Sequence, residues 1–234
     1  MNNQFIKTNP ISSAFIAAAV ALPLVFVAYF SFEPMVVVGQ SDSDSREFTI
    51  TQAVSEEVSF IVPPNNVEMD QTLSGLTGGT SNGSTTFSIA TNDAAGYSVE
   101  ISFATAGDRK VLLFDDDNSI GFESVSGFVN DLTEPDEGEA GLFGYSVVGN
   151  HVNSSFGDNG SSCDGSTTGT SDACFHMQGT PSTPETIINN PNATDSAGDE
   201  NSIVFRAVIG PDPDPTLPSG NYTATATLTA FTNS

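Results

Sequence analysis

Two cysteines and two histidines are the residues of this 234-residue chain whose side chains most often form covalent or metal bonds. Cys163 and Cys174 are its only cysteines, and they enclose a short polar segment. In an exported chain, a loop of this length favours a disulfide, nominally worth about 3 kcal/mol. A metal site with His151 and His176 would lack the close cysteine spacing of zinc sites. We therefore predict a Cys163–Cys174 disulfide and interpret both histidines as ordinary loop residues.

A cluster of oxygen-bearing side chains follows the apolar run VLLF. It comprises Asp115, Asp116, Asp117, Asn118 and Glu123. Carboxylate and amide oxygens are the ligands that calcium prefers. The spacing does not match an EF-hand loop, because Gly121 comes one position late and Ser126 stands where a bidentate glutamate should be. A calcium site of another kind and a solvated acidic turn both remain open, and no other cofactor is indicated. A second acidic run, residues 131–139, predicts a solvated loop.

No combination of residues indicates a reaction. Serines, acids and two histidines are present, but no serine lies in a G-x-S-x-G motif. The chain has no tryptophan and four tyrosines, so the aromatic platforms common in sugar-cleaving clefts are scarce. We therefore expect no catalytic residues and no enzymatic activity, with a secreted hydrolase as the remaining alternative.

The composition is strongly acidic without being highly charged. Lys and Arg number 5 against 29 Asp and Glu, which gives a net charge of −24. This charge repels nucleic-acid phosphates and anionic headgroups, so we expect no nucleic-acid partner. Ser, Thr, Asn and Gly carry most of the polarity, which favours β-strands and turns. The 17 phenylalanines and the 38% of apolar residues are enough for a folded core.

Residues 11–32 form an uncharged apolar segment. As a helix, this segment would be long enough to cross the hydrocarbon core of a bilayer, which is about 30 Å thick. Lys7 precedes it and acidic residues follow it, which places residues 1–10 in the cytoplasm and the remainder outside. A transmembrane signal anchor and a cleaved signal peptide both remain open. We expect the chain at the extracellular side of the membrane or at the cell surface, and secreted if the segment is cleaved.

We interpret residues 33–46 as a stalk and residues 47–234 as one all-β domain. Alternation of apolar and polar residues predicts about nine strands. They are residues 48–50, 58–62, 85–92, 96–103, 109–114, 119–125, 141–148, 201–209 and 221–231. We expect the first four to pair as two hairpins and the last to be a single central or late-docking strand. Residues 149–200 predict a long irregular insertion. The expected fold is an antiparallel β-sandwich or jelly-roll-like barrel.

Three patterns give the chain a resemblance to bacterial surface and pilus-subunit β-sandwich proteins, spore-coat-U-type secreted pilins among them. They are SFIVPP at 59–64, TFSIATNDAAGYSVEIS at 86–102 and SGNYTATATLTAF at 219–231. The resemblance implies a structural or adhesive surface role without catalysis. The long hydrophobic segment and the placement of the cysteines depart from the secreted pilins.

These observations lead to one main expectation about function. The chain would be a non-catalytic cell-surface protein, tethered through residues 11–32, that contacts cell-surface or envelope components or assembles with itself. The alternative is an extracellular module that binds calcium or carbohydrate.

Overall fold

A computed structural model describes residues 45–104, 110–124, 127–130, 132, 140–158, 163, 174–177, 183–214 and 216–233. Its contacts divide the chain into two units, Met1–Ala53 and Val54–Ser234. The predicted cytoplasmic residues 1–10, the hydrophobic segment 11–32, most of the stalk and the acidic run near 131–139 lie outside the described residues. Within the described part of the chain, no helix is long and apolar enough to cross a membrane.

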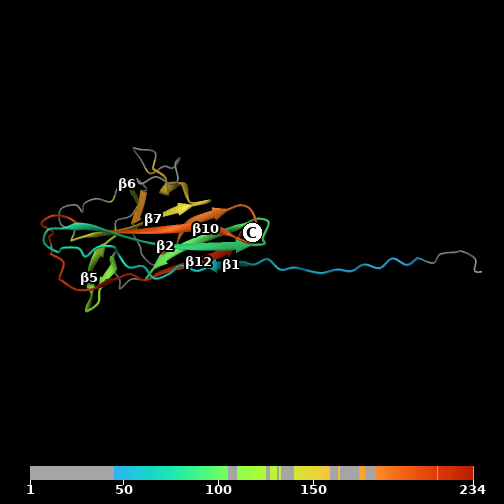
Figure 1. Cartoon of the computed structure of the whole chain (residues 1–234), viewed down its shortest axis with the longest axis horizontal. Helices are drawn as coiled ribbons and strands as arrows, with labels where there is room; N and C mark the ends of the chain where they lie inside the picture. Colours follow the sequence, from blue (N-terminus) through green and yellow to red (C-terminus); the bar gives the residue numbers. More distant parts are fainter. Residues whose placement is uncertain are drawn as a thin grey trace, which may run out of the picture. The chain divides into compact units, whose positions relative to one another are not determined.

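The second unit is almost entirely β-structure (Figure 1). Its described elements are β1 (Val58–Val62), β2 (Gly79–Thr91), β3 (Tyr97–Phe103), β4 (Lys110–Phe114), β5 (Asp117–Glu123), β6 (Gly127–Asn130), β7 (Leu142–Gly149), η1 (Ser154–Phe156), β8 (Cys174–Met177), β9 (Glu185–Asn190), β10 (Asp199–Ile209), β11 (Tyr222–Thr223) and β12 (Ala226–Thr232). The all-β prediction is thereby confirmed.

The strands form two sheets. The larger has the order β1-β2-β10-β7-β5-β4-β11, with β8 pairing with β7 and β6 pairing with β8. The smaller has the order β12-β3-β9. Figure 1 shows β2, β10 and β7 as neighbouring ribbons, with β5 at the left of the view. Pairing is antiparallel except for one parallel contact between β5 and β7. The small sheet therefore has far fewer strands than the sheet it faces.

The core between the sheets follows from the alternation in the sequence. In β3, the side chains of Tyr97, Val99, Ile101 and Phe103 are buried, while the residues between them are half-buried. The large sheet contributes residues such as Phe87 to the same core. A second, smaller cluster joins Leu132, Leu142, Phe175 and Val208 and packs β8 against β7 and β10. Period-2 burial is what a strand with one face on a core requires.

The predicted hairpins are wrong in their pairing. Residues 48–50 form no strand, and Phe48 and Ile50 are both exposed. β2 and β3 exist where expected, but they belong to different sheets. The connector 92–96 therefore carries the chain from one sheet to the other instead of forming a hairpin turn. Alternation indicates which side chains face the core, and two strands facing one core from opposite sheets have the same alternation as two paired strands.

The last predicted strand and the predicted irregular insertion also need correction. Residues 221–231 divide into β11, which pairs with β4 in the large sheet, and β12, which pairs with β3 in the small sheet. β12 is an edge strand rather than a central one. Residues 149–200 contain β8, β9 and the start of β10. The polar sequence of this stretch hid these strands, because several of their positions carry Asn, Thr or His.

Candidate binding groove

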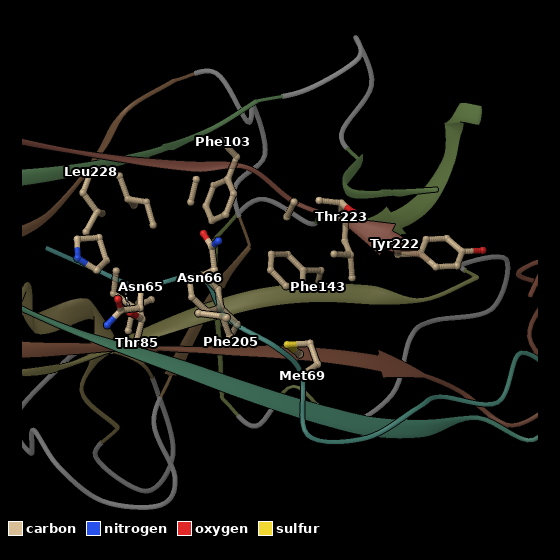
Figure 2. Close-up of a pocket in the computed structure, with 17 residues that line it drawn as sticks. Asn65, Asn66, Met69, Thr85, Phe103, Phe143, Phe205, Tyr222, Thr223 and Leu228 are labelled. Atoms are coloured by element: carbon tan, nitrogen blue, oxygen red, sulfur yellow. Dashed lines mark hydrogen bonds between the residues drawn. The ribbon is translucent and has the colours of Figure 1, made fainter. Parts of the chain in front are cut away.

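A cavity of about 370 Å³ opens where the small sheet ends and leaves part of the large sheet uncovered. Phe143 and Phe205 contribute from the large sheet, and Phe103 and Leu228 from the small sheet. Figure 2 shows these side chains gathered around the space, with Tyr222 at one end. Ala226 and Leu228 of β12 line this cavity, and among the described residues β12 pairs only with β3, although β1 also lies close to it.

A second cavity of about 680 Å³ continues along the same side of the domain. It shares Met69, Leu112 and Tyr222 with the first cavity, and Leu76 and Leu217 lie at its far part. We call the two cavities together the groove. Among the described residues, no Asp, Glu, Lys or Arg lines either cavity. In a chain with a net charge of −24, a groove without charged side chains, lined by both apolar and uncharged polar residues, is suited to an uncharged ligand.

Aromatic rings form the wall of the groove. Phe103 lies edge-on to Phe143 with ring centroids 6.2 Å apart, and Phe143 stacks on Phe205 at 6.0 Å. Where the two cavities meet, the Tyr222 ring contacts Phe114 and Phe122, with ring centroids 5.2 and 5.3 Å apart. The Tyr222 hydroxyl donates to the Pro218 carbonyl at 2.9 Å, and partial burial raises the pKa of this hydroxyl. Such rings present a rigid apolar surface.

One edge of β2 borders the groove. β1 pairs only with residues 88–91 of β2, so among the described residues no strand pairs with residues 79–87 on that side. Residues 65–71 run beside this part of β2 without forming a strand, and we call them the strap. Thr85 on β2 and Asn65, Val67 and Met69 on the strap all line the first cavity.

Residues 48–54, with the sequence FTITQAV, are an uncharged segment that precedes β1. Phe48, Ile50 and Val54 are 81, 82 and 81% exposed. These residues occupy alternate positions, with Gln52 completing the row, so an extended backbone would place all four on one face. Large apolar side chains are seldom exposed together in this pattern unless a partner covers them.

The acidic cluster predicted from the sequence lies at the β4–β5 hairpin; its acids do not line the groove, but Asp115 hydrogen-bonds to Thr223 and Asn221, which do. Asp115 and Asp116 form its turn, and Asp115 Oδ1 accepts a hydrogen bond from Thr223 Oγ1 at 3.2 Å. Asp117 Oδ1 accepts from the Ser119 hydroxyl and amide at 2.6 and 2.8 Å, and these bonds lower the pKa of the Asp117 carboxyl. Glu123 is at the opposite end of β5 and pairs with Lys110 on β4.

No group of three or more His, Cys, Asp or Glu side chains among the described residues lies close enough to hold a metal ion. The hairpin acids are exposed, and Asn118 lies with them on the exposed start of β5. The local hydrogen bonds of Asp117 explain this arrangement as a turn without requiring a cation. The calcium hypothesis remains a prediction for solution experiments.

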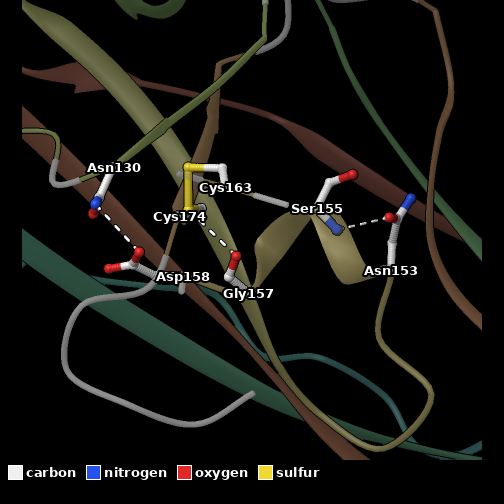
Figure 3. The surroundings of a disulfide bond; sticks show 7 residues. All are labelled: Asn130, Asn153, Ser155, Gly157, Asp158, Cys163 and Cys174. Atoms are coloured by element: carbon white, nitrogen blue, oxygen red, sulfur yellow. Dashed lines mark hydrogen bonds between the residues drawn. A yellow bond between two sulfur atoms is a disulfide. The ribbon is translucent and has the colours of Figure 1, made fainter. Parts of the chain in front are cut away.

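The predicted disulfide between Cys163 and Cys174 is present, and Figure 3 shows its surroundings. Cys174 is fully buried at the start of β8, and its Sγ lies 3.7 Å from the Gly157 carbonyl oxygen. Nearby, the Asn130 side-chain amide donates to Asp158 Oδ1 at 3.3 Å. The disulfide therefore ties the loop that follows η1 to β8, which packs on the large sheet.

The two histidines lie in different environments, and one of them is not a loop residue. His151 is exposed in the turn after β7, whereas His176 is buried on β8. The Tyr145 hydroxyl lies 3.1 Å from His176 Nδ1, and the rings of Phe128 and Phe156 surround the imidazole. Burial lowers the pKa of His176. The imidazole therefore packs within an aromatic cluster.

Sequence reasoning missed the groove, because it arises from a difference in strand number between two sheets. The alternation of Phe48 and Ile50 with polar residues is visible in the sequence, but it predicts a strand of the domain itself. Comparison with known proteins finds no family model that matches the chain and no matching curated protein.

Proposed function

We propose that this chain is an exported, non-catalytic surface protein with a structural or adhesive role, and that its β-domain assembles with further copies. In this proposal the segment 48–54 of one copy adds as a strand to the groove of another. The observation that carries it is the uncharged groove in an otherwise strongly acidic chain. The uncharged segment 11–32 supports export and attachment to the membrane.

Backbone chemistry supports strand addition as the mode of assembly. In the described part of the chain, β12 pairs with one strand only, and β2 has no strand on one side of residues 79–87. Unpaired strand edges bind extended segments through main-chain hydrogen bonds, while pockets between the sheets bind alternate side chains. The pattern of residues 48–54 has the required period.

The energy of such an insertion is substantial. Full burial of a Phe, Ile or Val side chain stabilises by about 1.5–3 kcal/mol. Phe48, Ile50 and Val54 are almost fully exposed in a single chain, so nearly all of this free energy is still available for association. The ordering of the segment and the loss of translational freedom oppose it. We therefore expect association that depends on concentration.

The test compares the full-length chain with a variant of the segment. Phe48→Ser with Ile50→Ser removes the apolar row, and Thr49→Ser with Thr51→Ser is the matched control on the other face. The native mass of each is measured in detergent by light scattering over a range of protein concentrations, together with its thermal midpoint. We expect oligomers for wild type and control, and a smaller species with an unchanged midpoint for the Phe48/Ile50 variant.

Detergent-held association through residues 11–32 would affect all three proteins equally, so the comparison isolates the segment. Equal oligomer formation by the Phe48/Ile50 variant and the control would contradict strand addition by residues 48–54. A wild-type chain that stays monomeric at every concentration would contradict self-assembly itself.

A further inference from the structure

We propose that the strap, residues 65–71, is a displaceable lid that occupies the strand position beside β2 until an added strand takes its place. This inference rests on the proposed function, because it assigns a regulatory step to the same groove. It predicts that the strap leaves β2 in a local opening, while β2 and β10 stay paired.

The sequence explains why the strap lies beside β2 without becoming a strand. β1 pairs with β2 up to Val62, and Pro63 and Pro64 follow. Proline has no amide hydrogen to donate to a ladder, so two in succession end the pairing of β1. The chain then continues along the same edge of β2, with the strap in the position that a continued β1 would have taken.

The strap is attached mostly through side chains. The Asn65 amide donates to Thr85 Oγ1 at 2.8 Å, and the Gln71 amide donates to Ser81 Oγ at 3.0 Å. Among the described residues, one hydrogen bond joins the two backbones, from the Asp70 amide to the Asn82 carbonyl at 2.7 Å. A regular antiparallel neighbour would use the backbone groups of successive β2 residues instead. An added strand can therefore form a more complete ladder than the strap does.

Asp70 makes the main hydrogen bonds that hold the strap against β2. Its Oδ1 accepts from the Asn82 amide at 2.8 Å and from the Ser81 hydroxyl at 3.0 Å. The Asp70 backbone amide donates to the Asn82 carbonyl, so Asp70 hydrogen-bonds to both the amide and the carbonyl of Asn82. The hydrogen bond from the Asn82 amide is the main cause that lowers the pKa of the Asp70 carboxyl. Removal of this carboxylate should loosen the strap more than any other single change in it.

The strap also forms the wall between the groove and solvent. Met69 lines both cavities, and residues on either side of it line one cavity each. The strap packs closely on Gly83 of β2, where a Cβ would lie 2.5 Å from Val67 Cγ1 and 3.1 Å from Met69 Sδ. Displacement of Val67 and Met69 would therefore join the cavities to the free edge of β2. This is the geometry that a lid on a strand-addition site requires.

The first experiment measures amide hydrogen exchange in the full-length chain by mass spectrometry. We expect peptides covering the strap to exchange at least 10-fold faster than peptides covering β10. Asp70→Ala should increase the exchange rate of the strap amides by about a further 10-fold and leave the exchange rate of the β10 amides unchanged. Asp195→Ala is the matched control, because Asp195 Oδ1 also accepts two backbone amides, from Ala197 and Gly198, in a different loop. Exchange of the strap at the same rate as β10 would overturn the lid.

The second experiment closes the lid covalently. Val67→Cys with Gly83→Cys places two thiols where the strap packs directly on β2. We expect the oxidised protein to assemble at least 10-fold more slowly than its reduced form and Asp70→Ala to assemble faster than wild type. Equal assembly of oxidised and reduced protein would overturn the lid and leave strand addition intact. If the wild-type protein does not assemble but the strap amides still exchange faster than those of β10, the proposed function is wrong. The hydrogen-exchange result then still supports local opening of the strap.

Discussion

At the scale of single residues, burial explains the positions that sequence chemistry could not interpret. His176 belongs to a buried cluster in which Phe128, Phe156 and Tyr145 surround the imidazole. Burial lowers the pKa of His176 and raises that of Tyr145, since both charged forms lose solvation. The charge of Glu185 also raises the pKa of Tyr145, and the pKa of Glu185 is itself raised by burial. His176 and Tyr145 are buried packing residues, and the shifted pKa of His176 makes stability depend on pH.

We expect His176 to make the protein less stable as the pH falls below about 6.5, the ordinary pKa of histidine. Above that pH the imidazole is neutral in both states; below it the unfolded chain binds a proton that the folded chain resists, so the free energy of unfolding falls. The raised pKa of Glu185 acts in the opposite direction. His176→Phe should therefore reduce the change in the free energy of unfolding between about pH 7 and pH 5. Urea denaturation at each pH measures this free energy.

His151→Asn is the control, because His151 is exposed at a φ of 56° that asparagine tolerates. It should keep the wild-type pH dependence. An identical dependence in His176→Phe and wild type would show that the buried imidazole does not control this range.

At the scale of elements, the connections decide which sheet each strand joins. The connector 92–96 carries the chain from β2 in the large sheet to β3 in the small one. Asp93 and Gly96 shape it, through hydrogen bonds from the Ala95 amide to Asp93 Oδ1 at 2.9 Å and from the Gly96 amide to the Asp93 carbonyl at 3.0 Å. Gly96 has a φ of 86°, and a Cβ there would lie 1.9 Å from the Asn190 carbonyl oxygen. The crossing therefore requires glycine at this position.

We expect Gly96→Ala to destabilise the protein by clearly more than the roughly 1–2 kcal/mol that a left-handed backbone costs a residue with a Cβ. Gly127 supplies the matched control, because its φ is 109° but no atom lies within 4 Å of a Cβ built there. Gly127→Ala should cost only the backbone strain. The measurement is the free energy of unfolding of both variants, and equal losses would show that the close approach to Asn190 is relaxed.

At the scale of the whole molecule, charge is distributed unevenly. The chain carries a net charge of −24, yet the described lining of the groove holds no charged side chain. Mutual repulsion of so many carboxylates opposes the folded state, and salt screens it over about 10 Å at 0.1 M ionic strength. Association through the groove therefore brings none of the carboxylates of this chain into the described lining.

We expect the thermal midpoint to rise when NaCl increases from 10 mM to about 0.5 M, because screening relieves repulsion in the folded state. MgCl₂ and CaCl₂ at matched ionic strength then test the hairpin acids. Equal midpoints in the two salts indicate screening alone. A larger rise in calcium that Asp117→Asn removes would establish the predicted calcium site, by the linkage between binding and stability. A midpoint that falls with NaCl would contradict the repulsion argument.

Local patterns in the sequence were sufficient for the properties that depend on neighbouring residues. The alternation of Tyr97, Val99, Ile101 and Phe103 predicted both the strand β3 and the face it buries. The spacing of Cys163 and Cys174 was enough to predict their disulfide. Composition alone indicated an all-β fold, because Ser, Thr, Asn and Gly favour strands and turns over helices.

Only the tertiary structure decided which strands pair, and therefore where the groove lies. β2 and β3 face each other across the core instead of pairing, and residues 221–231 change sheets between Thr223 and Ala226. The same alternation buries a side chain in either arrangement, so the choice depends on contacts between residues distant in sequence. The groove results from that choice, because it is the place where three strands fail to cover a much wider sheet.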